Sequence, residues 1–210
     1  MDISKSHDVN FVLLGSRRYI QAASMIHGLF EAVKSWPLGR INRLQLDVRA
    51  LLKEQGRYDL FRDVGEKQHV EKQYNAMFRL QCGEDLFWVG LKGRGEPVSV
   101  SEPYDENKLI SDCKILKDSK SATLVLQSDA LINNIIIALN KKLVNILFPT
   151  EEYGQWYVVR YELDLDKISL IEQSLLEIEV VGNIGASNTK SAIRLGGEPI
   201  GLVYFSRSIK

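Results

Sequence analysis

The sequence predicts an α+β protein built from two similar units, each a long helix accompanied by antiparallel strands. Residues 16–37 and 128–149 both open with a serine that can cap a helix, contain no internal proline, and end in an aromatic residue followed by proline. The alternation of apolar and polar residues in RLQLDV (43–48) returns in RYELDL (160–165), which predicts a strand after each helix. Pro37 corresponds to Pro149 and Pro97 to Pro199. We therefore predict an internal duplication.

Composition restricts the classes of protein to consider. The 210 residues are 45% hydrophobic and 26% charged, which is typical of a globular protein with a substantial core. The 27 basic residues balance the 27 acidic residues, so the sequence does not favour nucleic acid or an anionic membrane as a partner. No signal peptide or membrane-spanning segment is recognisable, and we expect a cytoplasmic location. Cys82 and Cys113 are expected to be free thiols, and no metal site or cofactor is predicted.

The order of elements predicts the boundaries of the units. Residues 10–16 form a short apolar run that predicts a strand before the first helix, and residues 74–101 predict an antiparallel meander with tight turns at CGED and GRGEP. The charged, unpatterned residues 53–73 are expected to be a surface insertion. We predict a first unit over 1–101, a connector over 102–119, and a second unit over 120–210.

This order of a strand, a long helix and several antiparallel strands resembles the hotdog fold of acyl-thioester enzymes. In that family a curved antiparallel sheet wraps around a long apolar helix, and two units pair into one sheet. The resemblance implies tandem hotdog units, a substrate that is an acyl thioester of coenzyme A or of acyl carrier protein, and active clefts at the junction of the two repeats. It is a resemblance of fold, which by itself says little about function.

The segment QSDALINNI (127–135) departs from the hydratase-type members of the family, because it supplies Asp129 and Asn133 but no histidine. The Phe-Pro loop histidine of dehydratase-type members is also missing. Thioesterase-type members, which use a carboxylate near the helix and the amides of the first helical turn, fit best. Asp129 would activate water in such a site. In the alternative interpretation, Asp129 stabilises the helix dipole and Asn133 satisfies backbone groups.

The first helix carries a second set of candidates. His27 and Glu31 are four residues apart and form the acid/base pair of that helix, although such a pair is also typical of a solvated helix face. Arg17 and Arg18 lie where cations oppose the helix dipole. They are candidates for binding a phosphate of coenzyme A, or for pairing with acidic residues of the insertion.

The sequence therefore leads to two hypotheses. The first is an acyl-thioester hydrolase or dehydratase-like enzyme that uses Asp129, Asn133, His27 and Glu31, with Arg17 and Arg18 at the coenzyme. The second is a non-catalytic hotdog-like protein that binds an acyl or other small apolar ligand, or serves as a scaffold. A homo-oligomer is compatible with both hypotheses.

Overall fold

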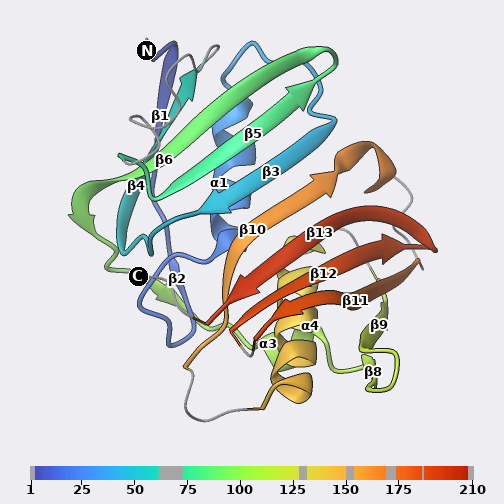
Figure 1. The fold of residues 1–210 in the computed structure, drawn as a ribbon. Helices are drawn as coiled ribbons and strands as arrows, with labels where there is room; N and C mark the ends of the chain where they lie inside the picture. The colour runs from blue at the N-terminus through green and yellow to red at the C-terminus, as the bar shows by residue number, and fades with distance from the viewer. Residues whose placement is uncertain are drawn as a thin grey trace. The chain divides into compact units, whose positions relative to one another are not determined.

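The computed structural model describes residues 3–61, 73–127, 132–149, 154–168, 174–185 and 187–207. The chain divides into two compact units, Met1–Tyr104 (unit 1) and Asp105–Lys210 (unit 2) (Figure 1). Residues 105–119 belong to unit 2, where they contribute a short helix and a strand, whereas the sequence predicted a connector there. None of the helices in the described ranges combines the length and the hydropathy needed to cross a membrane.

The described residues of unit 1 form an antiparallel sheet and one long helix. The described strands lie in the order β1-β4-β6-β5-β3. Their bounds are Lys5–Val9 (β1), Arg43–Val48 (β3), Glu54–Phe61 (β4), Ala76–Cys82 (β5) and Asp85–Pro97 (β6). Strands β2 (Leu13–Leu14) and β7 (Ser101–Glu102) form a separate short parallel pair.

Helix α1 (Ala22–Val33) is shorter than the predicted segment 16–37. Ser16 does not cap it, because the chain turns at Gly15, whose φ is +64°, and residue Gln21 is still extended. The Ile20 amide donates to the Leu52 carbonyl over 2.8 Å, which holds this approach segment against the loop after β3. After Val33 the chain closes a tight turn in which the Trp36 amide donates to the Val33 carbonyl.

Three strand predictions in unit 1 were wrong. The apolar run 10–16 contributes only Leu13–Leu14, and the strand that precedes the helix in the main sheet is β1. Residues 54–61 of the supposed surface insertion form β4, a strand with a buried core face. The segment GRGEP is not a turn, because it continues β6 through a register shift opposite Glu54 and Gly56. The predicted reversal at CGED is confirmed by the hairpin pair Cys82↔Asp85.

In the described part of unit 2, an antiparallel sheet is again combined with one long helix. The described strands lie in the order β10-β13-β12-β11-β9-β8. Their bounds are Lys114–Leu116 (β8), Ser121–Val125 (β9), Tyr157–Asp164 (β10), Leu175–Ile184 (β11), Asn188–Leu195 (β12) and Glu198–Ser206 (β13). Helix α3 (Glu106–Leu109) precedes the sheet, and a 3-10 turn follows β10 at Leu165–Ile168.

Helix α4 (Ile132–Leu147) fits the predicted segment 128–149 well. The start of the prediction, at Ser128, lies outside the described residues. The helical hydrogen bonding ends where the sequence predicted, since the Phe148 amide still donates to the Val144 carbonyl and Pro149 follows. Figure 1 shows α4 behind β12 and β11, and α4 also contacts β9.

Each unit has a long helix and an antiparallel sheet of its own, but the order of the strands differs between the two units. In unit 2, β11, β12 and β13 form successive hairpins, with a turn at Gly196 and Gly197 between β12 and β13. In unit 1, β6 lies between β4 and β5, so this half is not the predicted meander. Pro97 ends β6 whereas Pro199 lies near the start of β13, so this proline pair is not structurally equivalent. The internal duplication stays a prediction.

In each unit a buried tyrosine connects the sheet to the helix. The Tyr58 hydroxyl of β4 donates to the Met25 carbonyl of α1 over 2.6 Å. Gly28 makes room for this contact, because a Cβ there would lie 2.8 Å from the Tyr58 oxygen. In unit 2 the Tyr161 hydroxyl of β10 reaches Asn133 of α4. These contacts identify the face of each sheet that its helix covers.

Candidate active site

Asn133 lies in the first turn of α4 and is held there by the sheet of unit 2. The Tyr161 hydroxyl donates to Asn133 Oδ1 over 2.9 Å. Tyr161 is fully buried in β10, and burial raises the pKa of its phenol, so the phenol stays protonated and acts as the donor. Because Oδ1 accepts this bond, the Nδ2 group of Asn133 is the part of the amide that is left to donate. The half-buried side chain is therefore oriented as a hydrogen-bond donor.

Tyr161 was not among the residues predicted from the sequence. Its partner Asn133 was noticed because it interrupts an apolar helix. Tyr161 and Leu163 are buried in β10 whereas Arg160, Glu162 and Asp164 are more exposed, and this alternation marks Tyr161 as a core residue. Only the structure shows that its hydroxyl points to the helix. Asp129, the other candidate on this helix, lies outside the described residues.

The acid/base pair predicted on α1 lies on the exposed side of that helix. His27 and Glu31 are both exposed, whereas the neighbouring Ile26 and Leu29 are fully buried. Glu31 pairs with Lys34 Nζ at 2.8 Å. The hydrogen bond from Lys34, together with the charges of His27 and His7, lowers the pKa of the Glu31 carboxyl. This arrangement is that of a solvated ion pair, so a catalytic role for His27 and Glu31 stays a prediction.

Arg17 and Arg18 occupy different environments before α1. Arg18 is exposed. The Arg17 guanidinium donates to the Leu14 carbonyl and lies 5.5 Å from the centre of the Tyr104 ring. With the Gln21 amide in its satisfied orientation, its oxygen accepts from Arg17 Nε at 2.8 Å and from Nη1 at 2.7 Å. Arg17 thus organises the start of α1, and a role in binding coenzyme A stays a prediction for both arginines.

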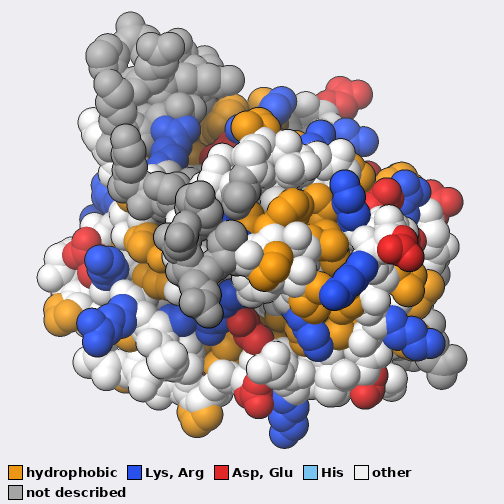
Figure 2. Space-filling model, turned by 60° about the horizontal axis from the view of Figure 1, so that its bottom comes forward, with side chains coloured by type: hydrophobic (Ala, Val, Ile, Leu, Met, Phe, Trp, Pro, Cys, Tyr) orange, Lys and Arg blue, Asp and Glu red, His pale blue; other side chains and the backbone are white. Residues whose placement is uncertain are grey.

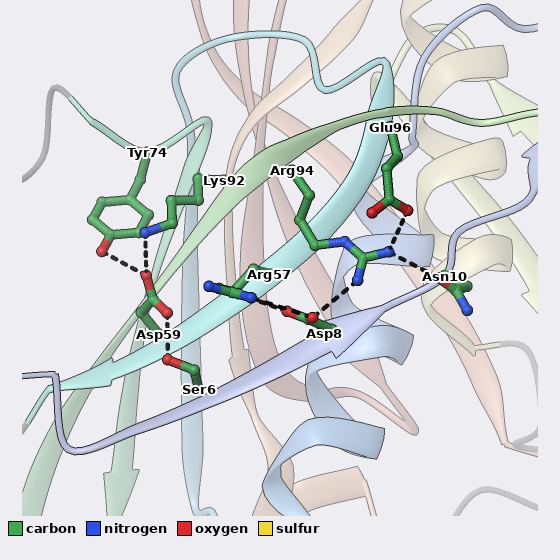
Figure 3. A network of polar contacts seen from close by, with 9 residues as sticks. All are labelled: Ser6, Asp8, Asn10, Arg57, Asp59, Tyr74, Lys92, Arg94 and Glu96. Carbon is green, nitrogen blue, oxygen red and sulfur yellow. Dashed lines mark hydrogen bonds and ion pairs between the residues drawn. The ribbon is translucent and has the colours of Figure 1, made fainter.

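A dense polar network covers the face of the unit 1 sheet that points away from α1 (Figure 3). Tyr58 faces α1, so its neighbours Arg57 and Asp59 point to the opposite face. Asp59 is fully buried, and its carboxylate accepts from Ser6 (2.7 Å), from the Tyr74 hydroxyl (2.9 Å) and from Lys92 Nζ (2.7 Å). Burial and the Asp59 carboxylate both raise the pKa of Tyr74.

The same network continues toward the end of β6. Asp8 pairs with Arg57 Nε at 2.6 Å and with Arg94 Nη1 at 3.0 Å. These cations lower the pKa of Asp8 to about 2. Arg94 also contacts Asn10 and Glu96. Because its acidic groups are paired with cations, we interpret this network as the means by which β1, β4 and β6 are joined, and not as a reaction centre.

The surface and the cysteines add little chemistry. On the face drawn in Figure 2, Lys and Arg side chains lie among hydrophobic ones and near Asp and Glu side chains. Cys82 is buried and Cys113 half-buried, and both are free. Within the part of the chain that the structure describes, no three His, Cys, Asp or Glu side chains gather as they would around a metal ion.

The fold is similar to that of solved thioesterases and dehydratase domains. A candidate thioesterase from Novosphingobium aromaticivorans is 13% identical, with a TM-score of 0.53 over 96% of this chain and 94% of the other. An acyl-ACP thioesterase from Bacteroides thetaiotaomicron is 11% identical, with a TM-score of 0.49 over 96% of each chain. The dehydratase domain of PpsC from Mycobacterium tuberculosis, in complex with C12:1-CoA, is 8% identical, with a TM-score of 0.47 over 96% of this chain and 92% of the other.

At these identities the likeness establishes the fold alone. The protein has the hotdog fold that its order of elements predicted. Comparison of the sequence with models of known protein families gave no match. Comparison with curated proteins gave no match either. The position of a cleft at the junction of the two repeats stays a prediction.

Proposed function

We propose that the protein hydrolyses an acyl thioester at the start of α4 in unit 2. The observation that carries this proposal is the bond from Tyr161 to Asn133 Oδ1, which leaves an amide N–H of Asn133 as a fixed donor near the start of the helix. Fixed donors of this kind stabilise the oxyanion that develops when a thioester carbonyl is attacked. Acyl thioesters are the substrates named for similar structures, such as the acyl-ACP thioesterase of Bacteroides thetaiotaomicron, and this likeness of fold supports the choice of reaction only as an analogy.

The proposed reaction consumes one water. Asp129 takes a proton from the water, whose oxygen attacks the carbonyl carbon of the thioester. The carbonyl oxygen becomes an oxyanion, which Asn133 Nδ2 stabilises by donating a hydrogen bond. When the tetrahedral intermediate collapses, the carbon–sulfur bond breaks, and the thiolate receives the proton. The products are a carboxylic acid and the free thiol of the carrier.

The first helix provides a second set of groups in this proposal. Arg17 and Arg18 would bind a phosphate of a coenzyme A carrier, and His27 with Glu31 would serve as an acid/base pair in a dehydratase-like reaction. The exposure of His27 and the pairing of Glu31 with Lys34 make the hydrolytic site on α4 the better supported of the two.

The experiment is a panel of acyl-CoA and acyl-ACP substrates of increasing chain length, with the released thiol measured. We expect turnover that Asn133→Ala lowers by about 100-fold to 1000-fold in kcat, as the loss of an oxyanion donor does. Tyr161→Phe leaves the Asn133 Nδ2 donor in place but removes the hydrogen bond that orients it, so we expect a smaller loss of kcat. Asp129→Ala removes the base. His27→Ala is the matched control. If His27→Ala lowers kcat strongly while the variants of Asn133 and Asp129 do not, the active site lies at α1 and not at α4.

The competing function is that of a non-catalytic protein that binds an acyl or other apolar ligand. The absence of a histidine from QSDALINNI favours it. A protein that releases no thiol from any substrate, yet is stabilised against heat by the same compounds in a saturable way, is such a binding protein. That result would exclude hydrolysis as the function, while an acyl or other apolar compound would still be the ligand.

A further inference from the structure

Asn140, Ser191 and Thr189 are among the buried polar side chains of unit 2 that make no hydrogen bond with any described residue. Asn140 in the middle of α4 is fully buried, and neither Oδ1 nor Nδ2 has a partner in the described ranges. The hydroxyls of Ser191 (0% exposed) and Thr189 (4% exposed) in β12 also have no hydrogen-bond partner among the described residues. Leaving buried polar groups unpaired is costly, and native proteins rarely do so without a reason.

Two contacts fix how α4 runs along the sheet of unit 2. In its first turn, Asn133 is bonded to Tyr161 of β10. Just after its last turn, the Phe148 carbonyl accepts from the Arg207 guanidinium. Asn140 lies about midway between these two anchors, seven residues after Asn133, on the same stripe of the helix.

The same two anchors locate Ser191 and Thr189. Tyr161 lies opposite Val203, and Val203 lies opposite Ser191, so these three side chains point to the face that α4 covers. At the other anchor, the Arg207 amide donates to the Ser187 carbonyl, next to the start of β12. Ser191 therefore lies level with the Tyr161 anchor, and Thr189 lies between it and the Arg207 anchor, both on the face of β12 that α4 covers.

The alternation of β12 supports this placement. Thr189, Ser191 and Ile193 are buried, whereas Asn188 and Lys190 between and beside them are exposed. Helix α4 contacts β12 directly, and Figure 1 shows it behind that strand. Asn140, Ser191 and Thr189 thus face one interior layer of unit 2, and we call them the Asn140 cluster.

We propose that the Asn140 cluster is a binding site for a neutral hydroxyl group, carried by a hydroxylated acyl chain. An amide and two hydroxyls offer both donors and acceptors, which complements a group that also does both. The three side chains are uncharged, so they offer no counter-charge to a charged ligand group that is buried among them. A neutral hydroxyl needs no counter-charge. The assignment of the hydroxyl to an acyl chain rests on the proposed function. A buried water offers the same chemistry, and the test separates the two.

The test compares a saturated medium-chain fatty acid with its positional hydroxy isomers, using calorimetry on the full-length protein. We expect at least one isomer to bind about tenfold or more tightly than the parent acid, because a site built for a hydroxyl discriminates against a ligand that lacks it. Asn140→Leu, which keeps the branched shape but cannot form hydrogen bonds, should abolish the preference, and Ser191→Ala should reduce it. Ser121→Ala is the matched control, since Ser121 is buried in the same unit but is bonded to Ser119 over 2.8 Å.

Crystal structures of the wild type with and without the preferred isomer distinguish the sources of the hydroxyl. Density for the ligand hydroxyl at the Asn140 cluster supports the proposal. Only water at the cluster, with equal binding of all the acids or no binding of any, overturns it. A protein that prefers a hydroxy isomer but releases no thiol from acyl thioesters would retain this site and lose the proposed hydrolysis, so the two failures are distinguishable.

Discussion

At the residue scale, the contact between Gly28 and Tyr58 is a close constraint on helix α1 of unit 1. A Cβ on Gly28 would lie 2.8 Å from the Tyr58 hydroxyl oxygen and 3.2 Å from Phe11 Cε1. The hydroxyl has little freedom to retreat, because it is bonded to the Met25 carbonyl and its ring is fully buried. Close packing thus explains why a glycine stands at this position of α1, although glycine in a helix lowers stability by about 1 kcal/mol relative to alanine.

We expect Gly28→Ala to destabilise the protein by about 1–3 kcal/mol through overpacking. In a Tyr58→Phe background the obstructing oxygen is gone, so the same substitution should cost much less, and the helix propensity of alanine should offset part of the loss of the hydrogen bond. Urea unfolding of the two single variants and the double variant measures this coupling. Gly39→Ala is the control, since nothing lies within 4 Å of the Cβ it would add. Additive effects would show that the two residues do not interact.

At the element scale, β1 is an edge strand of unit 1 that is joined to β4 both by its ladder and by charge. Lys5–Val9 pair with Gly56–Leu60, and Asp8 bridges Arg57 and Arg94. The pKa of Asp8 is lowered to about 2 from the usual 3.8, so its contribution to stability is present above about pH 4 and is lost as the pH falls toward 2. Asp8 is about half exposed, and solvent screening keeps the contribution small.

The expected result is that Asp8→Asn flattens the pH dependence of the free energy of unfolding between about pH 4 and pH 2, and lowers stability slightly at pH 7. Urea titrations at a series of pH values measure it, with Glu84→Gln, a change at an exposed turn residue, as the control. High salt should reduce the difference between Asp8→Asn and the wild type. An unchanged pH dependence in Asp8→Asn would mean that the ion pairs contribute nothing to the attachment of β1.

Strand β4 shows where prediction from the sequence succeeded and where it failed. Strand β3 and the end of α4 followed from regular alternation and from proline, both of which are local signals. The sequence predicts a surface insertion where β4 lies, because residues 53–73, with Arg57 and Asp59 among them, are charged and unpatterned. Asp59 is nevertheless buried, since Ser6, Tyr74 and Lys92 come from distant parts of the chain to pair with it. The alternation of Gly56, Tyr58 and Leu60 was the signal available for a buried strand.

The candidate site followed the same division between local and tertiary information. Asn133 was found because an asparagine is unusual in an apolar helix, a property visible in the sequence. Its partner Tyr161 depends on how β10 packs against α4, and neither strand spacing nor composition encodes that contact. Conversely, the spacing of His27 and Glu31 is typical both of an acid/base pair and of a solvated helix face, and only the structure shows that this side of α1 is exposed.

At the scale of the whole molecule, two units with the same kinds of elements differ in how local their pairings are. In unit 2, β11, β12 and β13 join through two consecutive hairpins. In unit 1 the hairpin of β5 and β6 is flanked by pairings between residues far apart in the chain, β3 with β5 and β4 with β6. Non-local pairings require more loop entropy to be lost before they stabilise the chain, which slows folding.

We therefore expect the amides of β11–β13 to become protected before those of β4 when the protein refolds from urea. Pulsed hydrogen exchange with mass spectrometry resolves the two groups of peptides on the millisecond to second timescale. Asp59→Asn should lengthen the time between the protection of β11–β13 and that of β4, because it weakens the pairing of Asp59 in β4 with Lys92 and changes nothing in unit 2. Gly197→Ala, at a φ of +88° in the turn between β12 and β13, should instead delay the protection of unit 2. Simultaneous protection of both sheets in all three proteins would show that strand order does not control the folding rate here.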